Sequence, residues 1–220
     1  MTRIKICGIK NEEQALAVAG GGADFIGLVF ARSPRQVTPA RAEKIVASLE
    51  QNMVAAVVVG VFVNARVGTV NRIAERCSLD WVQLSGDEPW EYCRELNHPV
   101  IKVIRVSRNK KAEQACRDLA YGTKLLKKQK HIFMLDSSAR EKYGGTGRKF
   151  DWKLAVPIAR EFPVIIAGGL TPGNVAEAIE IISPWGVDVS TGVETKGVKD
   201  MDKIRKFIEA VRGADGNQTR

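Results

Sequence analysis

The sequence predicts a single α/β domain folded as a (β/α)8 barrel, and two observations lead to that fold class. Short apolar runs alternate with amphipathic helical patterns along the whole chain, and the count reaches eight strands, each followed by a helix. Right-handed βα crossovers repeated eight times within 220 residues are typical of such a barrel. A doubly wound open sheet is the alternative. We expect the barrel to occupy residues 1–212 and residues 213–220 to form a frayed tail.

The strands are recognised by apolar runs bounded by turn residues. The expected strands are Arg3–Gly8, Asp24–Phe30, Val54–Phe62, Asp80–Leu84, Val100–Arg105, Ile132–Leu135, Pro163–Ala167 and Gly186–Val189. The third run is hydrophobic on both faces, as a buried parallel strand is. In the first run, Ile4 and Ile6 alternate with Lys5 and Cys7. If the sheet closes, Lys5 and Cys7 therefore line its interior.

The helices follow the strands at similar spacing, and Asn11 is a suitable N-cap for the first of them. That helix carries Ala15–Ala19, and the later ones are expected at Pro39–Leu49, Ala65–Arg76, Pro89–Leu96, Asn109–Tyr121, Trp152–Arg160, Pro172–Ile182 and Met201–Val211. The lysine-rich segment Gly122–Lys130 fits no core and is interpreted as a solvated surface excursion.

Composition limits the possible functions without choosing one. The chain has 34 Lys and Arg against 25 Asp and Glu, a net charge of +9, which suits nucleic acid, an anionic membrane surface or small anionic substrates. There is no signal-peptide pattern and no apolar run long enough to span a membrane, so we expect a cytoplasmic protein. The four cysteines form no C-x-x-C pair, which favours neither a zinc site nor a disulfide framework. Both histidines precede or open strands, at the end away from a barrel's active site.

The barrel fold predicts where the active site lies, because in such barrels it is built at the C-terminal ends of the strands. Polar or small residues reach that end at these positions: Cys7, Arg35, Asn64, Gln83, Arg105, Asp136, Gly168, Gly169 and Asp188 to Gly192. The turns after the seventh and eighth strands contain Gly168-Gly169 and Thr191-Gly192. Such barrels bind phosphate there through backbone N–H groups, so these four residues are predicted to bind phosphate.

Motifs at most of the strand ends together resemble one enzyme family. They are Lys5-Ile6-Cys7-Gly8-Ile9, Ser33-Pro34-Arg35, Gly60-Val61-Phe62-Val63-Asn64, Gln83-Leu84, Leu135-Asp136, Tyr143-Gly144-Gly145-Thr146-Gly147, Phe150-Asp151-Trp152, Ala167-Gly168-Gly169-Leu170, Asn174-Val175 and Gly186-Val187-Asp188-Val189. In this order they are similar to the phosphoribosylanthranilate isomerases of tryptophan biosynthesis. Three positions depart from the family pattern: Ser85 replaces a histidine, Thr191 a serine and Lys196 a proline.

The resemblance implies an Amadori rearrangement of N-(5-phosphoribosyl)anthranilate to 1-(2-carboxyphenylamino)-1-deoxyribulose 5-phosphate, without cofactor or metal. It assigns Asp136 as the general acid and Cys7 as the general base. We expect Lys5 to raise the thiolate fraction of Cys7. Arg35 is the candidate for the substrate carboxylate, because a planar guanidinium matches a carboxylate bidentately.

Two further residues, Gln83 and Asp188, are candidates for contact with the substrate. Asp188 is polar within an aliphatic strand and shares a face with Ser190, so it is expected to point into the barrel mouth. It either touches the substrate or orients a neighbouring side chain. The expected partner is a small phosphorylated molecule, and the protein is expected to act as a monomer or a homodimer without nucleic acid or membrane.

Two other classes of function are weighed against the isomerase. Another phosphosugar barrel enzyme, such as an epimerase or indole-glycerol-phosphate synthase, would need metal-binding histidines or a lysine acid at strand ends, and a synthase also a longer N-terminal extension. A non-enzymatic nucleic-acid binder would combine clustered basic residues with exposed aromatics. Aromatics make up only 6% of this sequence, and the lysine cluster contains none.

Overall fold

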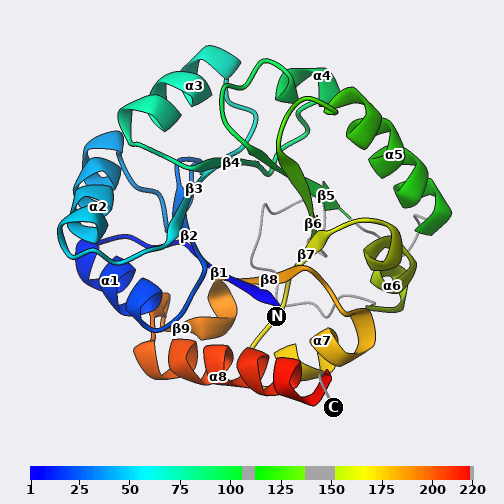
Figure 1. Cartoon of the computed structure of the whole chain (residues 1–220). Helices are drawn as coiled ribbons and strands as arrows, with labels where there is room; N and C mark the ends of the chain where they lie inside the picture. The colour runs from blue at the N-terminus through cyan, green and yellow to red at the C-terminus, as the bar shows by residue number, and fades with distance from the viewer. Residues whose placement is uncertain (106–111, 137–151, 219–220) are drawn as a thin grey trace.

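The computed structural model describes residues 1–105, 112–136 and 152–218. Its barrel strands are β1 (Arg3–Cys7), β2 (Phe25–Val29), β3 (Val57–Phe62), β4 (Trp81–Leu84), β5 (Val100–Arg105), β6 (His131–Asp136), β7 (Val164–Ala167) and β8 (Gly186–Val189). The strands pair in parallel in chain order, and β1 also pairs with β8. The sheet is therefore a closed barrel surrounded by helices (Figure 1). The predicted (β/α)8 barrel is confirmed, and the open-sheet alternative is wrong.

The helices cover the outside of the barrel between successive strands. They are α1 (Glu12–Gly20), α2 (Pro39–Gln51), α3 (Val67–Arg76), α4 (Trp90–Cys93), α5 (Ala112–Leu125), α6 (Trp152–Glu161), α7 (Val175–Ile182) and α8 (Met201–Gln218). The predicted N-cap is confirmed, because Asn11 Oδ1 accepts the N–H of Gln14 at 2.9 Å. The helix expected at Pro89–Leu96 is only the single turn α4. After α4, Asn71 binds the carbonyl of Glu95 and the N–H of Asn97. These backbone groups therefore have partners outside a helix.

Alternation along the strands divides the apolar side chains into two layers. Ile4 and Ile6 face outward and pack with the helices, whereas Lys5 and Cys7 face inward, as predicted. The barrel interior is filled from several strands by Phe25, Val59, Trp81, Ile101, Val103, Ile132, Met134, Ile165 and Ala167. Because these side chains pack the interior, a ligand on the barrel axis would bind beyond the strand ends.

The segment expected to be a solvated excursion is partly packed. Helix α5 continues to Leu125, and Gly122 is buried where any side chain would overlap the ring of Trp90. Leu126 is also buried, while Lys127 and Lys128 are exposed. The interpretation of Gly122–Lys130 as a purely solvated segment is therefore wrong, although its lysine side chains do face solvent.

An element missing from the sequence-based prediction follows β8. The 3-10 turn η1 (Thr191–Val193) leads into a short antiparallel hairpin of β9 (Glu194–Thr195) and β10 (Val198–Lys199). The hairpin is tied to the next helix, since Lys203 Nζ in α8 donates to the carbonyl of Glu194 at 2.9 Å. In the described residues, no helix has the length and apolar character needed to cross a membrane.

The final helix extends beyond its expected end at Val211. It continues to Gln218, so residues 213–218 are helical rather than a frayed tail. Ala214 is buried, and both carboxylate oxygens of Asp215 accept the backbone N–H of Thr2, at 3.0 and 2.8 Å. The Thr2 hydroxyl donates to the same carboxylate at 2.6 Å. These bonds attach the end of α8 to the start of β1.

Replacing Asp215 with alanine should destabilise the protein, because the partly buried N–H and hydroxyl of Thr2 would lose their acceptor. We expect the free energy of unfolding to fall by about 1–3 kcal/mol, measured by urea denaturation. Asp202→Ala, on the same helix, removes an exposed carboxylate and should change the free energy of unfolding by less than about 0.5 kcal/mol. Equal effects of the two variants would contradict the proposed attachment.

Candidate active site

A cavity of about 680 Å³ opens at the C-terminal ends of the barrel strands. All nine residues predicted for the site line it: Cys7, Arg35, Gln83, Asp136, Gly168, Gly169, Asp188, Thr191 and Gly192. They come from strands and loops that are far apart in the sequence, and the closed sheet gathers them at one opening. His98 and His131 lie near the start of β5 and β6, at the opposite end of the strands, as expected.

The seam between β1 and β8 carries a buried ion pair beneath the cavity. Lys5 and Asp188 are neighbours in the strand register, and Lys5 Nζ donates to Asp188 Oδ1 at 2.7 Å. Only 1% of the Lys5 side chain is exposed. Gly27 on β2 makes room for this arrangement, because a Cβ there would lie 2.9 Å from Cys7 Sγ and 3.1 Å from Lys5 Nζ.

The protonation of Cys7 follows from this buried setting. Burial raises the pKa of the Cys7 thiol above its ordinary value; the charge of Lys5 acts in the opposite direction, and that of Asp188 reinforces the rise. Lys5 therefore acts in the expected direction, because it lowers the pKa of the thiol, but burial outweighs this effect and the pKa of Cys7 is raised overall. Burial alone would lower the pKa of Lys5, but attraction to Asp188 and Cys7 raises it, so Lys5 stays charged. Much of the Lys5 charge is balanced by Asp188.

Asp136 ends β6, three strands away from β1 around the barrel. It is aligned with Arg105 at the end of β5 and with Ala167 at the end of β7. The predicted motif Tyr143–Gly147 and the residues Phe150 and Asp151 lie outside the described residues.

Gln83 and Ser85 form a polar patch on the β4 side of the cavity. Gln83 Nε2 donates to Ser85 Oγ at 3.0 Å, while Gln83 Oε1 is buried without a partner among the described residues. Arg105 Nη2 donates to the carbonyl of Ser85 at 2.7 Å. Ser85, which replaces the family histidine, is thus fixed by its neighbours on both sides.

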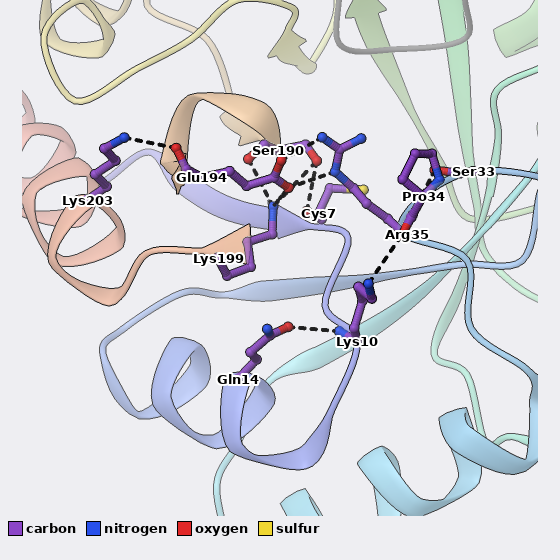
Figure 2. Close-up of polar contacts among 10 residues, drawn as sticks. All are labelled: Cys7, Lys10, Gln14, Ser33, Pro34, Arg35, Ser190, Glu194, Lys199 and Lys203. Carbon is purple, nitrogen blue, oxygen red and sulfur yellow. Dashed lines mark hydrogen bonds and ion pairs between the residues drawn. The ribbon is translucent and has the colours of Figure 1, made fainter. Parts of the chain in front are cut away.

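Arg35 reaches the cavity from the loop after β2. The backbone N–H of Arg35 donates to Ser33 Oγ at 3.1 Å. Lys10 Nζ, from the loop after β1, donates to the carbonyl of Pro34 at 3.2 Å (Figure 2). The Arg35 stem crosses Gly8, where a Cβ would lie only 2.5 Å from Arg35 Cδ. Gly8 also has a φ of +85°, which glycine adopts without strain. The residue after Cys7 is therefore a glycine for two separate reasons.

A charged cluster that the sequence patterns did not predict surrounds Arg35. Its guanidinium binds Glu194 through two hydrogen bonds, and Lys199 Nζ binds the same carboxylate. Glu194 and Lys199 are side by side in the unpredicted hairpin of β9 and β10. Charged residues after a last strand usually face solvent, and no local pattern in the sequence distinguishes these two as buried.

The two predicted phosphate-binding turns lie at the ends of β7 and β8. Gly168 and Gly169 have φ values of +91° and +70°, which explains why glycine occupies both positions. Asn174 holds this turn by donating to the carbonyl of Gly169 at 3.0 Å and accepting the N–H of Thr171 at 2.8 Å. At Gly192, any Cβ would overlap the carbonyl oxygen of Leu170, so the two turns are in direct contact.

The described residues contain no group of three or more His, Cys, Asp or Glu side chains arranged to hold a metal ion. The cysteines other than Cys7 are remote from the cavity. Cys77 and Cys93 are buried, whereas Cys116 is partly exposed. Burial raises the pKa of the Cys93 thiol to about 11. The one thiol that lines the cavity is Cys7.

Comparison with known proteins identifies relatives along nearly the whole chain. A family model described as N-(5'phosphoribosyl)anthranilate (PRA) isomerase matches residues 4–210. Proteins named N-(5'-phosphoribosyl)anthranilate isomerase from Dehalococcoides mccartyi and Geotalea uraniireducens are 47% and 45% identical to this chain. The first alignment covers 99% of both chains, and the second covers 97% of this chain and 100% of the relative.

Solved structures give the same result. The phosphoribosyl anthranilate isomerase from Thermotoga maritima superimposes with a TM-score of 0.82 at 37% identity, over 97% of this chain and 100% of that one. A phosphoribosyl anthranilate isomerase in complex with reduced 1-(o-carboxyphenylamino)-1-deoxyribulose 5-phosphate gives a TM-score of 0.79 at 36% identity, with the same coverage. From the extent of these matches and the shared fold, we conclude that the chain belongs to the N-(5'-phosphoribosyl)anthranilate isomerase family.

Proposed function

We propose that this chain converts N-(5-phosphoribosyl)anthranilate into 1-(2-carboxyphenylamino)-1-deoxyribulose 5-phosphate, with Asp136 as the general acid and Cys7 as the general base. The observation that carries the proposal is that both residues line one cavity, together with the two glycine turns. Membership of the family supports the activity and the substrate. The reaction is an internal redox exchange between neighbouring carbons, and we propose that it needs neither cofactor nor metal.

The rearrangement needs one proton donor and one proton acceptor. Protonation of the ribose ring oxygen by Asp136 opens the ring and leaves a protonated Schiff base at C1′. Cys7 then removes the proton from C2′, and the electron pair of that C–H bond moves towards the iminium nitrogen to give an enolamine. Tautomerisation of the enolamine, with protonation at C1′, yields the aminoketose. No atom is gained or lost.

The buried Cys7 is suited to act as a base in this sequence. A thiolate whose pKa is raised by burial is a minority form near neutral pH, but it is a stronger base than an ordinary thiolate. The protonated Schiff base brings a positive charge into the cavity, and a nearby positive charge favours the thiolate. Asp188 then acts mainly through Lys5, its ion-pair partner, rather than through the substrate.

Contacts in the cavity support roles for the other predicted residues. Arg35 is proposed to bind the carboxylate of the anthranilate ring. The unpartnered Oε1 of Gln83 is proposed to accept a hydrogen bond from a substrate hydroxyl or N–H group. Backbone N–H groups of Gly168, Gly169 and Gly192 and the Thr191 hydroxyl are proposed to bind the phosphate.

The assembly and location of the protein remain part of the proposal. We propose a cytoplasmic enzyme that acts as a monomer or a homodimer. The isomerase of Thermotoga maritima is described as dimeric, and one of its solved structures is of monomers generated from that dimer, which supports considering both states.

The activity is tested by adding the purified protein to freshly prepared phosphoribosylanthranilate and following the loss of substrate fluorescence. We expect first-order loss at a rate proportional to protein concentration, with the aminoketose as the product detected by mass spectrometry. A rate equal to that of the buffer alone would refute the proposed function.

Substitution of the two proposed proton-transfer groups should remove most of the turnover. We expect Cys7→Ser and Asp136→Asn each to lower kcat by about 10²–10⁴, because each removes a general acid or base while nearly preserving shape. The double variant should lose much less than the product of the two factors, since both groups serve one reaction sequence. Cys116→Ser, a thiol outside the cavity, is the matched control and should keep wild-type kcat. Cys7→Ser with more than about a tenth of native kcat would exclude Cys7 as the base.

Inorganic phosphate should compete with the substrate if the glycine turns bind phosphate. We expect competitive inhibition at about 10–50 mM phosphate, a range that corresponds to a weak but specific anion site. Gly192→Ala must displace the Leu170 carbonyl, so it should raise both KM and the inhibition constant for phosphate. Gly173→Ala, which meets nothing closer than 3.9 Å, is the control. Absence of inhibition in the folded wild-type protein would remove the phosphate assignment.

A further inference from the structure

The charged cluster around Arg35 is organised so that one edge of the guanidinium is already used. Arg35 Nε donates to Glu194 Oε1 at 2.7 Å, and Arg35 Nη2 donates to Glu194 Oε2 at 2.6 Å. Within the described part of the chain, Arg35 Nη1 has no hydrogen-bond partner. Arg35 lines the cavity and its side chain is 21% exposed, whereas Glu194 is only 4% exposed. One edge of the guanidinium is held, and donors on the other remain available.

Glu194, which binds Arg35, is itself held in place by buried contacts. Lys199 Nζ donates to Glu194 Oε1 and to the carbonyl of Ser190, both at 2.9 Å. Ser190 Oγ in turn donates to the carbonyl of Cys7 at 3.0 Å. Figure 2 shows Glu194, Lys199 and Ser190 gathered around the end of the Arg35 side chain, next to Cys7. The hairpin, the end of β8 and the end of β1 are thus joined in one network.

The charges of this network leave a site for an anion. Arg35 and Lys199 are cations and Glu194 is the carboxylate between them, so the cluster keeps one excess positive charge. Burial opposes ionisation of Glu194, but hydrogen bonds from Arg35 and Lys199 lower its pKa to about 2, and Glu194 is charged at neutral pH. A ligand carboxylate bound to the available donors of Arg35 would balance the remaining charge.

We propose that Glu194 is a positioning residue for the substrate carboxylate: it holds Arg35 by one edge so that the other edge meets the carboxylate on the aromatic ring. This inference rests on the proposed function, and it makes the hairpin after β8 part of substrate recognition. Arginine suits the position because a planar guanidinium has enough donors for two carboxylates, whereas a lysine ammonium has no second edge. The opposite reading is that Glu194 competes with the substrate for Arg35, and the two readings predict changes of opposite sign.

The test is the KM of Glu194→Gln, which keeps the size of the side chain but removes its charge. If Glu194 positions Arg35, KM should rise about tenfold or more while kcat changes by less than about threefold. A lower KM would show that Glu194 competes with the substrate, and an unchanged KM would show that it has no part in recognition. Either result would overturn the proposal.

A matched control is available in an exposed pair of the same geometry. Arg76 binds Glu43 through its Nε and Nη2 atoms at 2.7 and 3.2 Å, far from the residues that line the cavity. Glu43→Gln makes the same chemical change and should leave KM and kcat at wild-type values. An inactive wild-type protein would refute the proposed function, whereas an active wild type with an unchanged KM in Glu194→Gln would refute this inference alone.

Binding of two ligands can distinguish loss of Arg35 positioning from a general disruption of the cavity. Reduced 1-(o-carboxyphenylamino)-1-deoxyribulose 5-phosphate, which is bound in a related structure, and its analogue without the ring carboxyl should be titrated calorimetrically. Glu194→Gln should weaken binding of the carboxylated ligand about tenfold and leave the analogue unaffected. In the Arg35→Ala background, Glu194→Gln should cause no further loss for either ligand. Equal weakening of both ligands would indicate a merely structural role and overturn the proposal.

Discussion

Pairing of β1 with β8 is the constraint on which the whole site depends, because it closes the barrel and joins the ends of the chain. It makes Lys5 and Asp188 register neighbours although they are 183 residues apart in sequence. The same closure carries Cys7 to the turn after β8, where Ser190 binds its carbonyl. An open sheet with the same strands would separate the proposed base from the phosphate turns. The attachment of α8 to Thr2 supports this closure from outside the barrel.

Charge pairing explains how so many ionised side chains are held near one cavity. A buried charge without a partner costs several kcal/mol, and the cations Lys5, Arg35 and Lys199 each contact a carboxylate. Asp188 balances Lys5, and Glu194 lies between Arg35 and Lys199. Together these five side chains carry one excess positive charge. This arrangement favours an anionic ligand while giving each of these buried charges an oppositely charged neighbour.

The sequence contained enough information for the fold and for much of the cavity, because both follow from short-range patterns. Apolar runs located all eight barrel strands to within about three residues. Because the active site of such a barrel lies at the C-terminal ends of its strands, Cys7 and Asp136 were then expected at the same end. The contacts of Arg35 could not be predicted in this way. Glu194 lies 159 residues from Arg35, and its burial depends on how a hairpin of two two-residue strands packs. The pKa of Cys7 was also beyond pattern reasoning, because it is a balance between burial, Lys5 and Asp188.

Cys7 is a buried group of the cavity, and its protonation is set by burial more than by the charge of Lys5. The most direct test is the pH dependence of Cys7 alkylation by iodoacetamide in the free protein, followed by mass spectrometry of the Cys7 peptide so that the other thiols do not contribute. We expect a midpoint above the ordinary thiol value of about 8.5, and a lower midpoint in Asp188→Asn, which removes a negative charge beside the thiol. A midpoint below about 7.5 in the wild-type protein would mean that Lys5 outweighs burial, and it would contradict the account.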